Sequence, residues 1–215
     1  TQLVRPGAPV LYGGIPGMAD MRDLSYKAGG VEFGLMNAAI SQLAAYLGIP
    51  NYCSAGITEA KIPSMQAIYE KTFSICQVAL AGANYIHHAA GMLESMNCIA
   101  YEQYVIDDEI IGQACKILAG ISTDEDHLGF DAIREVGPGG NYLVSNHTFE
   151  HLRSEYFQGN GVSDKSNREQ WINNGGLSAR DRARDMVRAI LKRPLAPKID
   201  PGIEKEIRRD FKVLL

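Results

Sequence analysis

The chain has 215 residues, of which 46% are hydrophobic and 21% are charged, an ordinary composition for one globular domain with a sizeable core. The net charge is −4, the basic residues form no stripe, and no apolar run approaches the roughly 18 residues of a membrane span, so we expect neither a nucleic-acid nor a membrane partner. The four cysteines are far apart and form no CxxC pair, which favours reduced thiols in a cytoplasmic protein.

The first half of the chain reads as strands alternating with helices. Pro9–Tyr12 is a predicted strand that ends at two glycines, and Asn51–Ser54 is a second one. Apolar residues at helical spacing predict a helix before the second strand and another after it, the latter opened by Pro63. We expect the following side chains of these two helices to face the core: Met36, Ile40, Leu43 and Leu47, then Met65, Ile68, Tyr69, Thr72, Cys76 and Leu80.

The second half of the chain continues this alternation and then becomes helical. Asn84–His87 is a third predicted strand, and Tyr142–Val144 is a fourth. A helix over about Glu102 to Leu118 should turn Ile111, Ala114 and Leu118 inward. Capping boxes predict two helix starts, and an apolar stripe predicts a last helix; the residues concerned are Ser122 with Glu125, Ser178 with Asp181, and Ile203, Ile207 and Phe211.

The alternation of strands with long helices indicates βαβ units and a parallel sheet. Four such strands amount to half of an eight-stranded barrel, which typically takes roughly 250 residues, or to a small open α/β sheet; the spacing alone leaves both open. The chain begins at Thr1 with neither an initiator methionine nor a signal peptide, so we expect it to come from the middle of a longer chain.

Ligands of α/β folds meet the chain at the carboxyl ends of the strands. His87, His88 and His147 lie at or just beyond these predicted ends, and for each of them a structural role is an open alternative. The acidic run Asp107 to Glu109 lies early in a predicted helix, where dipole and capping effects explain it without a metal ion.

Residues 147–151 spell H-x-x-E-H. On a helix, His147 and His151 would share one face at the spacing that zinc needs. A zinc site also needs a third ligand, and nothing in the sequence singles out Glu204 or Glu206 for that part. We therefore expect no metal at this motif and keep a zinc hydrolase as an alternative function.

Four stretches in order carry a resemblance to a known family: Gln2–Pro9, Gly48–Gln66, Ala81–Asp108 and Glu135–Thr148. They resemble the trimethylamine methyltransferase family, whose members are (β/α)8 barrels that serve corrinoid proteins. The resemblance implies an α/β fold in which residues 1–160 are the C-terminal half of a TIM (β/α)8 barrel and residues 161–215 are a helical C-terminal extension packed on it. The missing N-terminal barrel half, or another copy of the chain, is then an expected partner.

The same resemblance implies an activity. Members specific for trimethylamine carry pyrrolysine, which we expect near the loop after Ser54, and this sequence has only standard residues there. That difference favours the branch resembling glycine betaine methyltransferases, which moves a methyl group from an N-methylated amine to the Co(I) of a corrinoid protein. The expected partners are the amine and a cognate corrinoid protein, so no cofactor is bound directly. A non-catalytic barrel fragment or interaction module is the alternative.

Candidate site residues follow from this chemistry. A quaternary ammonium suits aromatic faces, and a substrate carboxylate suits histidine or amide donors. We expect His87 and His147 to be catalytic residues. The expected substrate-binding residues are Tyr52, Ser54, His88, Glu94 and Asn146.

Overall fold

The structure is a computed structural model that describes residues 1–194 and 199–211. Its centre is a three-stranded sheet in which β4 (Asn51–Ser54) lies between β1 (Tyr12–Gly13) and β5 (Tyr85–His87). Both pairings are parallel. The predicted parallel order of the first three strands is thus confirmed, although the first strand is Tyr12–Gly13 and not Pro9–Tyr12, and the fold is of the α/β class.

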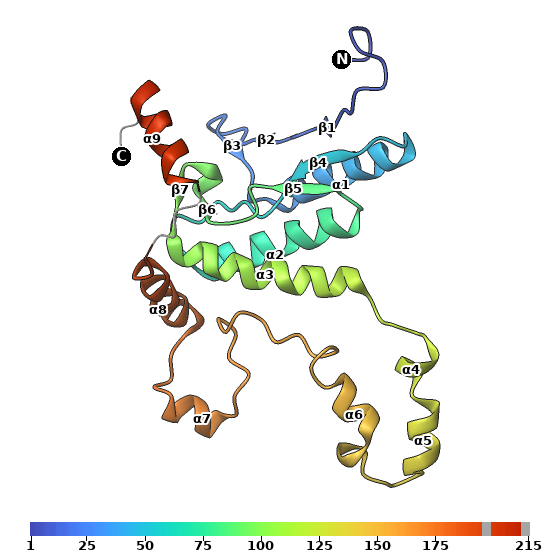
Figure 1. Cartoon of the computed structure of the whole chain (residues 1–215). Helices are drawn as coiled ribbons and strands as arrows, with labels where there is room; N and C mark the ends of the chain where they lie inside the picture. The colour runs from blue at the N-terminus through green and yellow to red at the C-terminus, as the bar shows by residue number, and fades with distance from the viewer. Residues whose placement is uncertain (195–198, 212–215) are drawn as a thin grey trace.

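Helices connect the strands and cover one side of the sheet (Figure 1). The connection from β1 to β4 contains a small hairpin and helix α1, and α2 connects β4 to β5. A second small hairpin with a 3-10 turn follows β5 and leads into α3. The bounds of these elements are β2 Met18–Ala19, β3 Tyr26–Lys27, α1 Val31–Tyr46, α2 Met65–Leu80, β6 Met92–Leu93, η1 Glu94–Met96, β7 Cys98–Ile99 and α3 Tyr101–Ala119.

The chain beyond α3 is helical wherever it has regular structure in the described residues (Figure 1). The predicted fourth strand is wrong, because Tyr142–Val144 forms a 3-10 turn. The Asn141 side chain accepts a hydrogen bond from the N–H of Leu143 at 3.0 Å, and this local bond favours a turn over a strand. The elements are α4 Glu125–Leu128, α5 Phe130–Val136, η2 Tyr142–Val144, α6 Asn146–His151, α7 Arg168–Asn173, α8 Ala179–Leu191 and α9 Pro201–Asp210.

The main core lies between the sheet and helices α2, α3 and α8. Cys53 of β4 packs with Val78 of α2 and Ile106 of α3, and Ala183 brings α8 onto the same cluster. Cooperative burial of such side chains is the main source of stability. In the part of the chain that the structure describes, no helix combines the length and hydropathy of a membrane span.

The predicted inward faces of the first two helices are right only in part. Ile40 of α1 and Cys76 of α2 pack against the main core, but Leu43 is 51% exposed and Met65 is 84% exposed. The buried faces carry small or polar residues instead, and Asn37 shows why: its side-chain oxygen accepts a hydrogen bond from the N–H of Ser54 at 3.2 Å. Hydrogen bonding to the sheet makes burial of such residues favourable. The buried residues are Phe33, Gly34, Asn37, Ser41 and Ala44 in α1 and Ala67, Lys71, Ser74, Ile75, Val78 and Ala79 in α2.

The helix starts agree only partly with the predicted capping boxes. Ser178 and Asp181 form a reciprocal capping box at the start of α8, as predicted. At α4 the predicted cap was wrong, because the cap is Asp124, whose carboxylate accepts a hydrogen bond from the N–H of His127. An acidic side chain at this position also interacts favourably with the helix dipole. In α3, Ala114 is buried as predicted, whereas Leu118 is 51% exposed.

Candidate functional site

The carboxyl ends of β4 and β5 present one polar and aromatic face. Side chains alternate along a strand, so Cys53 points to the helices while Tyr52 and Ser54 point to the opposite face. In the parallel register Tyr52 pairs with Tyr85 and Ser54 with His87. The sheet therefore brings two tyrosines, a serine and a histidine to one surface.

Four side chains on this surface form a compact group, which we call the strand-end cluster: Tyr52, Ser54, His87 and His88. The Ser54 hydroxyl lies 2.8 Å from His87 Nε2 and 3.2 Å from His88 Nδ1. The two imidazole rings are 3.9 Å apart between centroids, and Tyr52 meets the ring of His87 edge-on at 5.0 Å. Four predicted site residues are thus brought together.

The environment keeps His87 neutral. Partial burial lowers its pKa below the ordinary value of 6.5, and the neighbouring His88 lowers it further. Ser54 is fully buried and touches both rings, so the hydroxyl holds their orientation without adding charge. His87 therefore offers a neutral imidazole beside the aromatic ring of Tyr52 at physiological pH.

The loop after β5 carries a segment with a strained backbone. Glu94, Ser95 and Met96 have φ angles of 48°, 49° and 75°, all in the left-handed region. Non-glycine residues in this region cost free energy that the surroundings must offset, and such residues gather at binding sites. The backbone N–H of Glu94 donates to the carbonyl of Ala60 at 2.9 Å, which ties this loop to the loop after β4.

The Glu59 side chain links these loops by hydrogen bonds. Its carboxylate accepts hydrogen bonds from the N–H groups of Ala28 and Gly29 at 2.9 and 3.0 Å, and from the Ser95 hydroxyl. Burial alone would raise the pKa of Glu59, but these hydrogen bonds outweigh it and hold the pKa below its ordinary value. Glu59 therefore stays ionised and joins three segments of the chain.

A fully buried ion pair fixes the loops from the helix side. Lys71 of α2 lies 2.8 Å from the carboxylate of Asp107 on α3, and both side chains are 0% exposed. Lys71 also donates to the carbonyl of Gly56, and Asp107 accepts from the N–H of Gly91 at 2.7 Å. Burial lowers the pKa of Lys71 and raises that of Asp107. The pair thus anchors the loops after both β4 and β5.

Gly56 is required where these two loops meet. Its φ is +70°, and a Cβ at this position would lie 2.8 Å from the backbone of Ala89. Any larger residue would suffer both a strained backbone and a contact with main-chain atoms. The glycine therefore permits the close approach that holds His87 and His88 beside Ser54.

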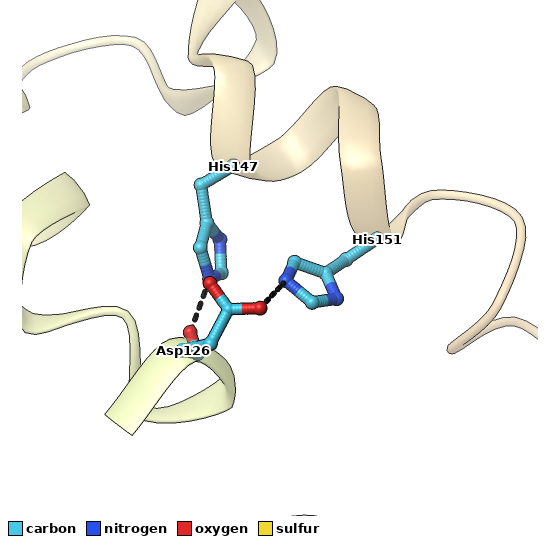
Figure 2. A group of neighbouring side chains, drawn as sticks. All are labelled: Asp126, His147 and His151. Carbon is cyan, nitrogen blue, oxygen red and sulfur yellow. Dashed lines mark hydrogen bonds and ion pairs between the residues drawn. The ribbon is translucent and has the colours of Figure 1, made fainter. Parts of the chain in front are cut away.

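The remaining predicted residues belong to a different part of the molecule. Asn146 and His147 lie on α6, which Figure 1 shows on the far side of α3 from β4 and β5. His147 Nε2 lies 2.6 Å from the carbonyl oxygen of Asp126, and His151 Nε2 lies 3.2 Å from the Asp126 carboxylate (Figure 2). The structure does not bring these residues to the strand-end cluster, so the catalytic role of His147 and the substrate-binding role of Asn146 stay predictions.

Three of the side chains that hold the loops after β4 and β5 were not predicted from the sequence. Glu59 follows a predicted strand end, and that position was the available signal. Lys71 and Asp107 look like ordinary helix-surface charges, and only the tertiary structure pairs them. Dipole and capping effects were therefore the wrong explanation of the acidic run, since Asp107 is buried against Lys71.

Comparisons with known proteins agree on one family. The sequence profile of the trimethylamine methyltransferase family matches residues 1–213. A glycine betaine methyltransferase of Desulfitobacterium hafniense is 33% identical over 207 residues, which are 96% of this chain and 43% of that protein. A trimethylamine methyltransferase of the same species is 36% identical over 93% of this chain and 40% of its own length. A trimethylamine methyltransferase of Methanosarcina mazei is 35% identical over 96% of this chain and 41% of its own length. The chain thus spans less than half the length of these relatives.

Proposed function

The chain belongs to the trimethylamine methyltransferase family, and we propose that its protein moves a methyl group from a quaternary or tertiary N-methylated amine of the glycine betaine type to the Co(I) of a cognate corrinoid protein. The observation that carries the proposal is the strand-end cluster. Its aromatic face and the neutral His87 at the carboxyl ends of parallel strands suit a small cation.

The proposed reaction needs little from the protein in the way of proton transfer. The reduced cobalt supplies the nucleophile, the bond between nitrogen and the methyl carbon breaks, and its electron pair stays on nitrogen. A quaternary ammonium thereby leaves as a neutral tertiary amine, so no general acid is required. What the protein must supply is a fixed position for the cation with one methyl directed outward.

The cluster residues fit this task in different ways. Tyr52 offers an aromatic face to the trimethylammonium group. A neutral His87 avoids the repulsion that an imidazolium would exert on a cation. His88 can donate a hydrogen bond to a substrate carboxylate. Glu94 is proposed to lie beside the cation on the strained loop, and no cofactor is proposed to bind this chain directly, because the corrinoid is the acceptor carried by its partner.

We further propose that the parallel sheet is part of the C-terminal half of a (β/α)8 barrel, residues 1–160, with residues 161–215 as an extension packed on it. The order β1-β4-β5 with helical crossovers supports this, as does the length of the relatives. Tyr85 is 59% exposed and Val10 is 43% exposed at the open sheet. An N-terminal half, or another copy of the chain, would cover such residues.

The direct test is methyl transfer by the purified protein, expressed with whatever native sequence flanks this chain, to its cognate corrinoid protein in the Co(I) state. Methylation of the cobalt is followed by its visible absorption after addition of glycine betaine, trimethylamine or dimethylamine. We expect glycine betaine to be used and trimethylamine to be inactive. No transfer from any methylated amine would favour the non-catalytic interaction module.

Variants of Tyr52 test whether the strand-end cluster is the amine site. Tyr52→Leu removes the aromatic face and should raise KM for the amine about tenfold, the scale of one cation–π contact. Tyr52→Phe keeps the face and is the matched control, expected to retain KM. Equal effects of the two substitutions, or none, would place the amine elsewhere.

A further inference from the structure

We propose that Asp126, His147 and His151 form a binding site for one divalent transition-metal ion of the zinc class, separate from the strand-end cluster. One ligand atom from each of these residues lies within 4.8 Å of the other two. Figure 2 shows both imidazoles turned toward Asp126, that of His151 toward its carboxylate and that of His147 toward its main-chain oxygen. The proposal departs from the expectation drawn from the sequence, because Asp126 offers the third ligand that the sequence alone did not identify. The site goes beyond the proposed methyl transfer and is independent of it.

One ring nitrogen of His151 lacks a hydrogen-bond partner among the described residues. His151 Nε2 is buried and has no hydrogen-bond partner among the described residues, although the Asp126 carboxylate oxygen lies only 3.2 Å away. Leaving a buried polar atom without a partner costs free energy. A metal ion between these two atoms would use the lone pair of the imidazole and the charge of the carboxylate together.

The chemical type of the three ligands indicates which metal ion would bind. Two imidazoles and one carboxylate are typical ligands of zinc and of its neighbours in the first transition row, whereas magnesium and calcium prefer oxygen alone. His147 and His151 are four residues apart on α6, so they share one helix face. Their ring centroids are 4.4 Å apart.

The geometry needs only a small adjustment. Ligand atoms of a tetrahedral ion with bonds of about 2.0–2.1 Å lie roughly 3.3 Å apart. The widest separation of 4.8 Å must therefore shorten, which rotation of the exposed Asp126 side chain allows. A cavity of about 660 Å³, lined by Asp126, His147 and Glu150 among others, lies beside the site and leaves room for a water as the fourth ligand.

A neighbouring group of possible ligands is less suited. It combines His151 with His127 and Glu155. Glu155 already lies 3.6 Å from the ammonium of Lys116, and His127 Nδ1 lies 2.7 Å from Asp124. These partners compete with a metal ion. In the proposed site, His147 Nε2 lies 2.6 Å from the main-chain oxygen of Asp126, so His147 would have to release this contact or bind the ion through Nδ1. The nitrogen of His151 that faces Asp126 has no hydrogen-bond partner among the described residues.

The consequence of binding would be a cross-link between two short helices. α4 has four residues and α6 has six, lengths at which a helix is not stable by itself in water. An ion held by Asp126 on one and by both histidines on the other would fix their relative position. Ligands from different segments make metal binding and local folding the same event.

The test is binding of Co²⁺ and Zn²⁺ by the purified protein with its native flanking sequence, first freed of metal by a chelator. Equilibrium dialysis should give one equivalent, and Co²⁺ should develop visible bands of a tetrahedral site. X-ray absorption of the zinc form should show nitrogen and oxygen ligands at about 2.0–2.1 Å and no sulfur. This measurement on the unaltered protein does not depend on any variant folding.

Variants then locate the ion. Binding of the one metal equivalent should be lost in each of His147→Ala, His151→Ala and Asp126→Asn. It should be retained in Asp131→Asn, because Asp131 is an exposed carboxylate beside the same cavity. Loss with His127→Ala but not with His147→Ala would overturn the proposal in favour of the neighbouring group. Absence of binding, sulfur ligands, or loss only with His87→Ala would also overturn it.

Discussion

The sheet region, residues 12–119, and the segment of α4 to α6, residues 120–160, hold their histidines in different ways. His87 and His88 lie at the end of β5. The loops there are anchored by the buried ion pair of Lys71 and Asp107 and by the close approach of Gly56 to Ala89. His147 and His151 sit on a six-residue helix and contact Asp126 of α4 directly, with a cavity beside them. The first pair is therefore positioned by the core, and the second by its own polar contacts.

The comparison shows that buried polar contacts fix a loop more firmly than exposed ones. In the sheet region, Lys71 and Asp107 satisfy backbone groups of two loops, so moving either loop exposes a buried charge. In the α4 to α6 segment the contact of 3.2 Å between His151 Nε2 and Asp126 leaves the Asp126 side chain 68% exposed, and water can replace this contact at little cost. Substitutions in the two regions should accordingly differ in how far their effects spread.

The largest effect is expected from Lys71→Met. Removing the ammonium leaves Asp107 buried without its partner, which should lower the free energy of unfolding by about 3–5 kcal/mol. Urea denaturation of the protein measures this. The matched control is Lys116→Met, whose partly exposed pair with Glu155 should contribute less than about 1 kcal/mol. Equal losses would mean that burial does not distinguish the two pairs.

Gly56→Ala should have the next largest effect. The φ of +70° and the contact with Ala89 should together cost about 2 kcal/mol of unfolding free energy. Gly48→Ala is the matched control, because Gly48 has a φ of +66° and a Cβ added there would meet nothing within 4 Å. Its cost should be limited to the backbone strain, roughly 1 kcal/mol. If Gly48→Ala proves the more harmful, the close approach of the loops is not the constraint.

Removing one serine helix cap from each region compares the two regions with the same substitution. Ser64 caps α2 and Ser145 caps α6, each accepting from a backbone N–H. Ser64→Ala should lower the global unfolding free energy by about 1 kcal/mol. Ser145→Ala should leave it unchanged and only speed amide exchange within α6, because that helix opens without the core. A global loss with Ser145→Ala would show that α6 is integrated into the core.

The smallest effect concerns pH. Burial lowers the pKa of His87, so the unfolded chain takes up a proton at this residue before the folded protein does. Stability should then fall as the pH drops below 6.5, the ordinary value, and level off below the folded pKa. Titration of the ring by NMR should give a value under 6.5 that rises in His88→Gln yet stays depressed. A His87 pKa above the ordinary value would contradict the assigned environment.

Part of this molecule follows directly from its sequence. The strands around Asn51 and Tyr85 were predicted because apolar runs bounded by glycine or asparagine leave few alternatives. Their ends located Ser54, His87 and His88 correctly. Tyr142–Val144 looked like a strand by the same criterion, yet local hydrogen bonding by Asn141 produced a turn, which a pattern of hydrophobicity does not record.

The rest depended on tertiary contacts. Apolar periodicity selected Leu43 and Met65 as core residues, but Asn37 and Lys71 are buried in their place through hydrogen bonds to distant segments. Such pairing joins residues that lie far apart in the chain, and a single sequence carries no sign of it. The members of the strand-end cluster could therefore be predicted from the sequence, whereas the groups that hold them in place could not.

The hydroxyl of Ser54 has one hydrogen and touches a nitrogen of each imidazole. When both rings are neutral, it donates to one ring and accepts from the other. If it donates to His87 Nε2, then His87 carries its proton on Nδ1 while Nε2 of His88 is bare; the reverse arrangement exchanges both. The tautomers are thus correlated, and the pair always presents one donor and one acceptor to whatever lies beside it. A substrate carboxylate would select the arrangement by accepting from the ring that carries the outward proton, and the serine would relay that choice to the other ring.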